Sequence, residues 1–270
     1  TGIYTSPRHS AIIGSISSSG RNLVSGNDEG GIYCTLNPPL TVIAFLNISG
    51  GTHFGDDPPP PEGLCTIRGN DVGVNVSRNT AIPNTYNHFI LRPGMNFLNP
   101  GGGLAIDNSN TYSSIGDPAG TSATSCTGFC NLVSGETTTV PEAIAFDAGI
   151  QAHGLGSVQI FNNYAGVNGT GTASIPNGTG IEAGTPVETR IGAASSPTSL
   201  GNLASGNRLA GIDVPYGNLV FVQANLVGTD VSGSIAIPNG SGIDATVGTG
   251  TIVIVGGSQP ADGKVIAGNT

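Results

Sequence analysis

The sequence has no tryptophan, a single lysine (Lys264) and few charged residues of either sign. Asp, Glu, Lys and Arg make up 9% of its 270 residues, against about 25% in an average soluble domain. The 17 acidic residues outnumber 8 scattered basic ones, so the net charge is −9. A nucleic-acid-binding protein carries a basic stripe, and we therefore expect no nucleic-acid partner. No apolar run reaches the roughly 18 residues of a membrane-spanning helix, so we also expect no membrane span.

Glycine and proline are plentiful, with 44 and 18 residues. Glycine shows no period of three, which excludes a collagen-like chain. The hydrophobic content of 37%, rich in Ile and Val, is too high for an intrinsically disordered chain. These features predict a folded protein whose short elements are separated by tight turns.

Three short phrases recur along the chain. Asn-Leu-Val-Ser-Gly-Asn and its variants occur at 22–27, 131–135, 202–207 and 265–269; Ile-Pro-Asn ends the segments 81–84, 174–177 and 236–239; Ile-Gly or its variant occurs at 13–14, 115–116, 191–192 and 255–257. Between these phrases lie eight dipeptides in which a small residue is followed by Ile, Val or Leu, and we call each of them a small-residue step. They occur at 2–3, 31–32, 73–74, 103–104, 143–144, 180–181, 211–212 and 242–243. Four of the seven intervals between these steps are 29 to 31 residues long. We attribute the longer intervals to loop insertions near 50–63 and 117–130.

Within each unit, apolar stretches of three to six residues alternate with Gly, Asn, Asp and Ser, as in 211–242. This pattern favours short β-strands, because Gly and Asn interrupt every stretch before a helix could form. Equal positions in stacked coils lie about 4.8 Å apart, so we predict ladders of inward Ile on Ile and of corner Asn on Asn. The sequence thus predicts an all-β fold, a parallel β-helix (solenoid) of about eight coils forming a single domain over residues 1–270.

Three segments carry a family resemblance: NLVSGN, ANLVGTDVSGSIAIPNGSGI at 224–243, and IVIVGG. They resemble the right-handed parallel β-helix repeats of large bacterial secreted and cell-surface proteins, within the pectate-lyase-like superfamily. The resemblance covers nearly the whole chain and is strongest over 130–270. It implies a right-handed β-helix but no particular function, since this fold carries enzymes, adhesins and fibres. Pectate lyases combine clustered Asp with a basic residue, but no family motif matches around Arg190 or Arg208, so no catalytic residue is assigned.

The residue after each small-residue step is expected to point outward, because side chains alternate along a strand. In the last three units this residue is Glu182, Asp213 or Asp244. Such an acidic row could bind Ca²⁺ weakly, since Ca²⁺ takes oxygen ligands. The alternative is a solvated acidic face. No other cofactor is expected.

The four cysteines are expected to form disulfides rather than a zinc site, because the four histidines are not spaced to complete one. Cys126 and Cys130 flank a short loop in a Ser/Thr-rich segment, and Cys34 with Cys65 is the other possible pair. Disulfides indicate an extracellular or cell-surface location. Five N-x-S/T sequons are candidate glycosylation sites, namely Asn47, Asn75, Asn168, Asn177 and Asn239. We expect Asn177 and Asn239, after Ile-Pro, to be the best acceptors at exposed corners, although Asn-Gly-Ser/Thr is also a turn sequence.

Neither end of the predicted rod carries a recognisable polar cap. Residues 265–270 followed by residues 1–5 read VIAGN-TTGIYT, which matches the internal NLVSGN-DEGGIYC. The chain is therefore either part of a longer solenoid or stacks head to tail with copies of itself. A globular β-helix with ends covered by loops is the remaining alternative. The stacking prediction rests on Gly2, Ile3 and Tyr4 at one end and on Val265, Ile266 and Asn269 at the other.

The leading functional prediction is a non-enzymatic, extracellular structural protein that stacks into a filament or surface fibre, with adhesion as a further role. The alternative is a polysaccharide-binding or polysaccharide-cleaving β-helix protein, with carbohydrate as its partner. The latter would need paired carboxylates, and the one Asp-Asp pair in the sequence, Asp56 and Asp57, lies in a proline-rich segment.

Overall fold

The computed structural model describes residues 2–5, 11–14, 21–27, 30–36, 65–86, 103–108, 112–116, 124–138, 148–154, 156–185, 187–192, 201–258, 263 and 265–270. Every regular element among them is a β-strand, and every pairing between named strands is parallel. The prediction of an all-β chain of short parallel strands is therefore confirmed.

The strands form three seven-stranded sheets and one small pair. Sheet 1 contains β1 (Ile3–Thr5), β4 (Ile32–Leu36), β8 (Leu104–Asn108), β12 (Ile150–Gly154), β15 (Ile181–Ala183), β18 (Ala210–Asp213) and β21 (Ser241–Asp244). Sheet 2 contains β2 (Ala11–Ile13), β5 (Cys65–Ile67), β9 (Tyr112–Ile115), β13 (Ser157–Ile160), β16 (Glu188–Ile191), β19 (Leu219–Val222) and β22 (Ile252–Val255). Sheet 3 contains β3 (Asn22–Val24), β6 (Asn70–Val72), β10 (Leu132–Val133), β14 (Tyr164–Ala165), β17 (Leu203–Ala204), β20 (Leu226–Val227) and β23 (Val265–Ile266). The pair joins β7 (Thr85–Tyr86) to β11 (Thr137–Thr138).

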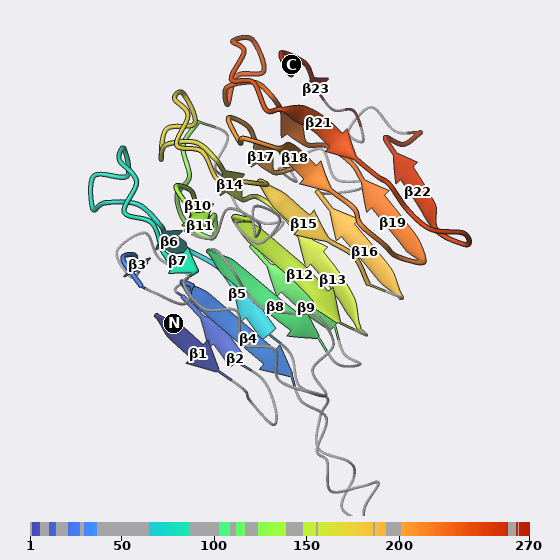
Figure 1. The fold of residues 1–270 in the computed structure, drawn as a ribbon, viewed down its shortest axis with the longest axis horizontal. Coiled ribbons are helices and arrows are strands. Elements are labelled where there is room, and N and C mark those ends of the chain that lie inside the picture. The colour runs from blue at the N-terminus through green and yellow to red at the C-terminus, as the bar shows by residue number, and fades with distance from the viewer. Residues whose placement is uncertain are drawn as a thin grey trace, which may run out of the picture.

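The chain visits the three sheets in turn, so each sheet grows by one strand per circuit. In Figure 1 the strands climb as a stack from β1 to β21, and the two chain ends lie at opposite ends of it. This arrangement is compatible with a parallel β-solenoid.

One of the eight predicted repeat steps, at 73–74, does not lie in sheet 1. Ile32 pairs directly with Leu104 in sheet 1, whereas Val74 forms an isolated bridge with Ala81 outside that sheet. The predicted step at 143–144 lies outside the described residues, and the strand that follows β8 in sheet 1 begins at Ile150. The described part of the chain therefore supplies seven strands to each sheet.

One hydrophobic core is shared by all three sheets. Its buried members include Ile150 and Ile181 of sheet 1, Ile115 and Ile160 of sheet 2, and Val133 of sheet 3. Register places Ile150 beside Ile181 and Ile115 beside Ile160, which confirms the predicted inward ladders. Burying one such side chain contributes roughly 1.5–3 kcal/mol, so this repeated column is a main source of stability.

The recurrent Ile-Gly phrase has a steric cause. Gly116 and Gly192 end strands of sheet 2 with positive φ angles of 81° and 86°, a backbone region that L-residues with a Cβ rarely adopt. A Cβ at Gly116 would also collide with the carbonyl of Phe161 in the next coil, and a Cβ at Gly192 with that of Gln223. Glycine is therefore required where the chain turns out of sheet 2.

A second buried cluster lies along sheet 3, where Leu132, Tyr164 and Leu203 pack with Val167. Loops at 75–80, 168–173 and 230–235 are each flanked by an antiparallel bridge, Val74–Ala81, Val167–Ser174 or Thr229–Ala236. Within the described ranges, no helix is long and apolar enough to span a membrane. The predicted insertion near 50–63 lies outside the described residues, as do residues 117–123 of the other one.

Candidate functional site

Two columns of buried polar side chains run along the corners of the stack. The 2–3 ladder, where sheet 2 leads into sheet 3, consists of Asn22, Asn70, Asn131, Asn163, Asn202 and Asn225. The 3–1 ladder, where sheet 3 leads into sheet 1, consists of Asn27, Asn84, Glu136, Asn177, Asn207, Asn239 and Asn269. The predicted stacking of corner Asn on Asn is thereby confirmed.

In both ladders the hydrogen bonds between side-chain amides run in a single direction along the stack. In the 3–1 ladder, Asn207 Nδ2 donates to Asn239 Oδ1 of the following coil at 2.9 Å and to the Ala165 carbonyl of the preceding coil at 3.2 Å. In the 2–3 ladder, Asn163 Nδ2 donates to Asn202 Oδ1 at 3.0 Å and to the Ile115 carbonyl at 3.0 Å. From one side-chain amide to the next, the hydrogen bonds thus always run from the Nδ2 of one coil to the Oδ1 of the following coil, so the columns of amides are polar.

This placement corrects the expectation that Asn177 and Asn239 lie at exposed corners, and their glycosylation stays a prediction. Both side chains are buried, with 0% and 1% of their surface exposed, and the Nδ2 that a glycan would occupy donates within the ladder in each case. Asn75 and Asn168 instead lie half-buried in the loops, where their Oδ1 atoms accept backbone N–H bonds. Asn47 lies outside the described residues.

The C-terminal end face of the stack is open. The inward-pointing Val255 and Ile266 are 50% and 42% exposed, whereas Val222 and Val227, their register partners one coil earlier, are fully buried. Asn269 is the last residue of the 3–1 ladder in this chain, and its Nδ2 lies 3.4 Å from the carbonyls of Val227 and Ala267. Inward apolar groups and a hydrogen-bond donor therefore face outward together on this end face.

The same end face carries an unused strand edge. In earlier coils the residue after the small-residue step donates its N–H to the next coil: Ile3 to Gly31, Ile32 to Gly103, and Ile150 to Gly180. Ile243 is the equivalent residue on β21, the last strand of sheet 1.

At the N-terminal end face, β1 is the first strand of sheet 1. Gly2 is exposed, Ile3 is half-buried, and Tyr4 follows on β1. At the opposite end, Val265 is half-buried and lies with Ile266 on β23. The residues predicted for self-assembly therefore lie in the outermost coils.

An acidic cluster occupies the outer surface of sheet 1 near the C-terminal end. Register places Glu182 beside Asp213 and Asp213 beside Asp244 on consecutive strands, as the sequence pattern predicted. Gln151 precedes them in the row, in place of the residue at 145 that the pattern suggested. The three predicted acidic residues are therefore brought together.

Contacts within the cluster differ from one carboxylate to the next. Glu182 Oε1 lies 3.0 Å from His153 Nε2 and accepts a hydrogen bond from Gln151 Nε2 at 3.2 Å. Asp213 has a pKa raised to about 6, first by burial and then by the charges of Glu182 and Asp244. The row therefore holds one carboxylate beside a histidine and one carboxyl group that exchanges a proton near neutral pH.

His153 was not predicted as a site residue. It is 94% buried on β12, its ring centroid lies 5.4 Å from that of Tyr216, and Tyr216 itself is 39% exposed. Its position two residues after Gln151 on an alternating strand could have placed it on the same face, but the strand boundary at Ile150 was not recognised in the sequence.

No group of three or more His, Cys, Asp or Glu side chains in the described ranges is arranged to hold a metal ion. Calcium binding by Glu182, Asp213 and Asp244 therefore stays a sequence prediction, which calorimetric titration tests. Arg190 and Arg208 do not join the acidic row. Arg190 pairs with Glu188 at 2.7 Å and lies over the Phe221 ring in sheet 2, and Arg208 donates to the Glu136 carbonyl at 3.4 Å.

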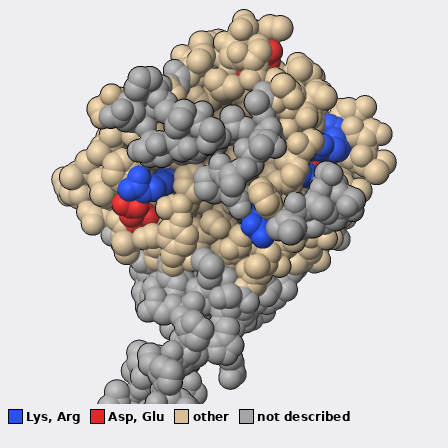
Figure 2. All heavy atoms as spheres, turned by 180° about the vertical axis from the view of Figure 1, so that it is seen from behind, with Lys and Arg blue, Asp and Glu red and all other residues tan. Residues whose placement is uncertain are grey.

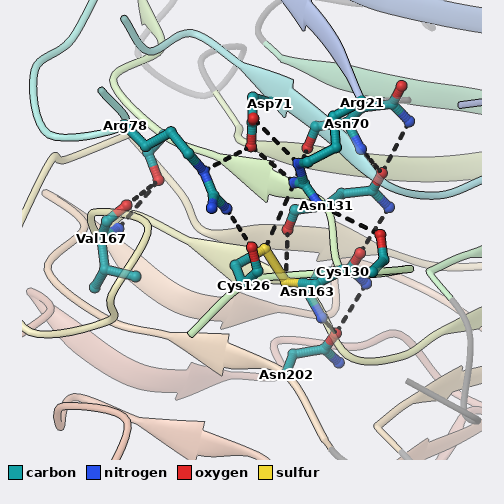
Figure 3. Close-up of a disulfide and its surroundings, with 12 residues drawn as sticks. Arg21, Asn70, Asp71, Arg78, Cys126, Cys130, Asn131, Asn163, Val167 and Asn202 are labelled. Carbon is teal, nitrogen blue, oxygen red and sulfur yellow. Dashed lines mark hydrogen bonds and ion pairs between the residues drawn. A yellow bond between two sulfur atoms is a disulfide. The ribbon is translucent and has the colours of Figure 1, made fainter. Parts of the chain in front are cut away.

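The disulfide Cys126–Cys130 lies beside a compact ion-pair cluster (Figure 3). Arg21 donates to both oxygens of Asp71, at 2.7 and 3.1 Å, and Arg78 Nε lies 3.0 Å from Asp71 Oδ1. Arg78 also donates to the Cys126 carbonyl. Burial lowers the pKa of Arg78, and Asp71 opposes this effect. The cluster ties three successive coils together at one corner.

The second disulfide joins Cys34 and Cys65, so both predicted pairings are confirmed and all four cysteines are oxidised.

Charged groups are sparse elsewhere. In Figure 2 the blue and red atoms form a few small, separate groups on a surface that is otherwise neutral where it is described.

The chain was compared with models of protein families, with curated proteins and with solved structures, and none of them matches it.

Proposed function

We propose that this chain is a length of right-handed parallel β-helix that acts as an extracellular structural element, pairing end to end with further coils to build a filament or surface fibre. The right hand follows from a general rule, since a strand that returns to the same sheet in parallel does so by a right-handed connection in nearly all proteins. Each sheet here is made entirely of such returns. The repeat phrases of the pectate-lyase-like superfamily support the same hand.

The observation that carries the proposal is the open C-terminal end face. Val255 and Ile266 expose apolar surface that their register partners bury completely. An open edge of strand N–H and C=O groups is a template for pairing with another strand. A further coil would cover the apolar side chains and use these backbone groups.

Two further features suit a structural element outside the cell. Both disulfides are formed, which suits an oxidising compartment. The surface carries few long charged side chains, since Lys and Arg together number 8, so little side-chain entropy is lost when copies come into contact.

Electron microscopy and sedimentation of the purified chain test the proposal. We expect unbranched rods that lengthen with protein concentration and sediment far faster than a monomer. Particles that stay monomeric at every concentration would contradict self-stacking.

The acidic cluster supports a second candidate function, carbohydrate binding. Half-buried Asp213 and exposed Asp244 present carboxyl groups on the outer surface of sheet 1, and Tyr216 presents a partly exposed ring beside the buried His153. Binding measured against a panel of neutral, acidic and amino polysaccharides tests it, with Tyr216→Ala as the variant that should lose binding. Equal binding by the variant would reject this surface.

A further inference from the structure

The two end faces of the stack are complementary in the direction of their hydrogen bonds. We propose that copies of this chain stack in one polarity and one register, with the C-terminal end face of one copy on the N-terminal end face of the next, so that β21 pairs with β1 of the next copy and Asp244 lies beside Tyr4. This inference rests on the proposed function and adds to it the partner, the polarity and the register.

The first argument comes from the backbone of sheet 1. At Ile3, Ile32 and Ile150 the N–H donates to the glycine carbonyl of the next coil. Ile243 continues this series on β21, and Gly2 continues the glycine series, because Ile3 follows it as Ile32 follows Gly31. The Ile243 N–H of one copy therefore meets the Gly2 carbonyl of the next.

The second argument comes from the 3–1 ladder. Every Asn in it donates from Nδ2 toward the C-terminal end, from Asn27 to Asn84 at one end and from Asn239 to Asn269 at the other. Asn269 therefore offers a donor on its end face, and Asn27 offers its Oδ1 acceptor on the opposite end face. Head-to-tail stacking joins donor to acceptor. Head-to-head stacking would set two acceptors against each other.

The third argument comes from charge. The row on sheet 1 begins with tyrosines at 4 and 33 and ends with Glu182, Asp213 and Asp244. Two C-terminal end faces brought together would place two edge strands that both carry Asp244 next to each other, and like charges on neighbouring strands repel. Head-to-tail stacking places a tyrosine position next to Asp244 instead and avoids this repulsion.

Disulfide trapping tests the polarity and the register together. Adjacent strands lie about 4.8 Å apart, within the Cα separation that a disulfide spans. The paired variant Asp244→Cys with Tyr4→Cys should form a ladder of covalent multimers under mild oxidation, because each copy then carries one partner at each end. The native cysteines are all disulfide-bonded, and mass spectrometry of the cross-linked peptides verifies the new bond.

Three matched controls separate the alternatives. Asp244→Cys alone should give no more dimer than wild type, and so should Tyr4→Cys alone. Asp244→Cys with Tyr33→Cys, one coil further from the junction, should cross-link at least tenfold less than the proposed pair. Efficient cross-linking of either single variant would overturn the polarity, and a stronger Tyr33 pair would overturn the register.

A fourth variant tests the ladder junction directly. Asn269→Asp keeps the oxygen that accepts from Asn239 but removes the outward donor, together with the two long 3.4 Å bonds from Nδ2 to the Val227 and Ala267 carbonyls. We expect it to weaken stacking at least tenfold by sedimentation while the monomer keeps its melting temperature to within a few degrees. Unchanged stacking would overturn the ladder argument. Rods that form without any trapped Asp244–Tyr4 pair would reject this inference and leave the proposed function standing, whereas the absence of any assembly would remove both.

Discussion

Asn84 donates its backbone N–H and its side-chain Nδ2–H to the two carboxylate oxygens of Glu136, each at 2.9 Å. Glu136 is fully buried and takes the rung of the 3–1 ladder that asparagine fills in the other described coils. Glycine beside the rung leaves room for its side chain in this coil as in the asparagine coils: a Cβ at Gly73 would collide with the Glu136 carboxylate, and a Cβ at Gly166 with the Asn207 amide. One acidic residue thus continues a column of amides.

We predict that Glu136→Ala destabilises the fold by about 1–3 kcal/mol for each of the two Asn84 N–H groups left without an acceptor. Urea unfolding of Glu136→Ala, Asn84→Ala and the double variant measures the coupling between the two residues. The coupling should reach about 0.5–3 kcal/mol, as for residues in direct contact. Strictly additive effects would show that the two side chains do not support each other.

The repeat phrases predicted the parallel strands and the inward column of isoleucines, because both follow from local periodicity. They also predicted the Asn ladders, because equal positions recur in stacked coils, but they did not reveal what selects asparagine there. Left-handed backbone is not the cause, since the described non-glycine residues with positive φ are Arg78, Asn162 and Ala224, and none is a ladder member. The ladder asparagines are selected by paired donor and acceptor groups in neighbouring coils, which a single repeat does not reveal.

Substitution of a ladder asparagine should be far more costly than the same change in a loop. Asn163→Asp replaces a buried donor by a carboxylate that faces Asn202 Oδ1 and the Ile115 carbonyl, and an unpaired buried charge carries a large desolvation penalty. We expect a loss above about 3 kcal/mol, which exceeds the usual loss from a single substitution.

Asn168→Asp is the matched control for Asn163→Asp. The Oδ1 of Asn168 accepts the N–H groups of Thr172 and Ala173, and the carboxylate of Asp230 makes the equivalent bonds in its own loop. The change should therefore alter stability by less than about 0.5 kcal/mol. Thermal melting of the two variants side by side measures the contrast, and similar losses in both would rule out the ladder as the cause.

Asp213 should make the fold less stable as pH rises. Its pKa is raised from 3.8 to about 6 in the folded state, so folding carries no penalty from this group below 3.8 and the full penalty above about 6. Asp213→Asn removes the penalty. The melting temperature of the variant relative to wild type should therefore increase as pH rises from about 4 to about 7.

Asp230→Asn is the control of opposite sign. Hydrogen bonds to its carboxylate, first from the Ile235 N–H, lower the pKa of Asp230, so this group stabilises the fold above its ordinary pKa and the contribution disappears as pH falls. The Asp230 variant should therefore lose melting temperature relative to wild type at neutral pH and approach it in acid. A pH-independent difference for both variants would contradict the two assignments.

The sequence predicted the acidic row correctly, but it did not predict that His153 contacts this row. Glu182, Asp213 and Asp244 recur at one position of an unbroken repeat, so strand register alone brings them together. His153 lies on β12, and the segment before this strand does not have the usual repeat length. The contact of His153 with Glu182 depends on where β12 begins. Sequence periodicity therefore locates residues within regular coils and fails next to insertions.

Two of the ion-pair sites in the described ranges, at Asp71 and at Glu188, should respond very differently to loss of their acid. Asp71 is buried and neutralises two guanidinium groups, those of Arg21 and Arg78, so Asp71→Asn leaves two cations without a counter-charge and should cost about 3–5 kcal/mol. Glu188→Gln removes the partner of Arg190 at a site where both side chains are about 30% exposed, and it should cost less than about 1 kcal/mol. Urea unfolding at low and high salt measures both losses. Salt should reduce the Glu188 effect and leave that of Asp71 largely unchanged, because buried charges are poorly screened. A small, salt-sensitive loss at Asp71 would show that this corner is solvated and does not tie the coils together.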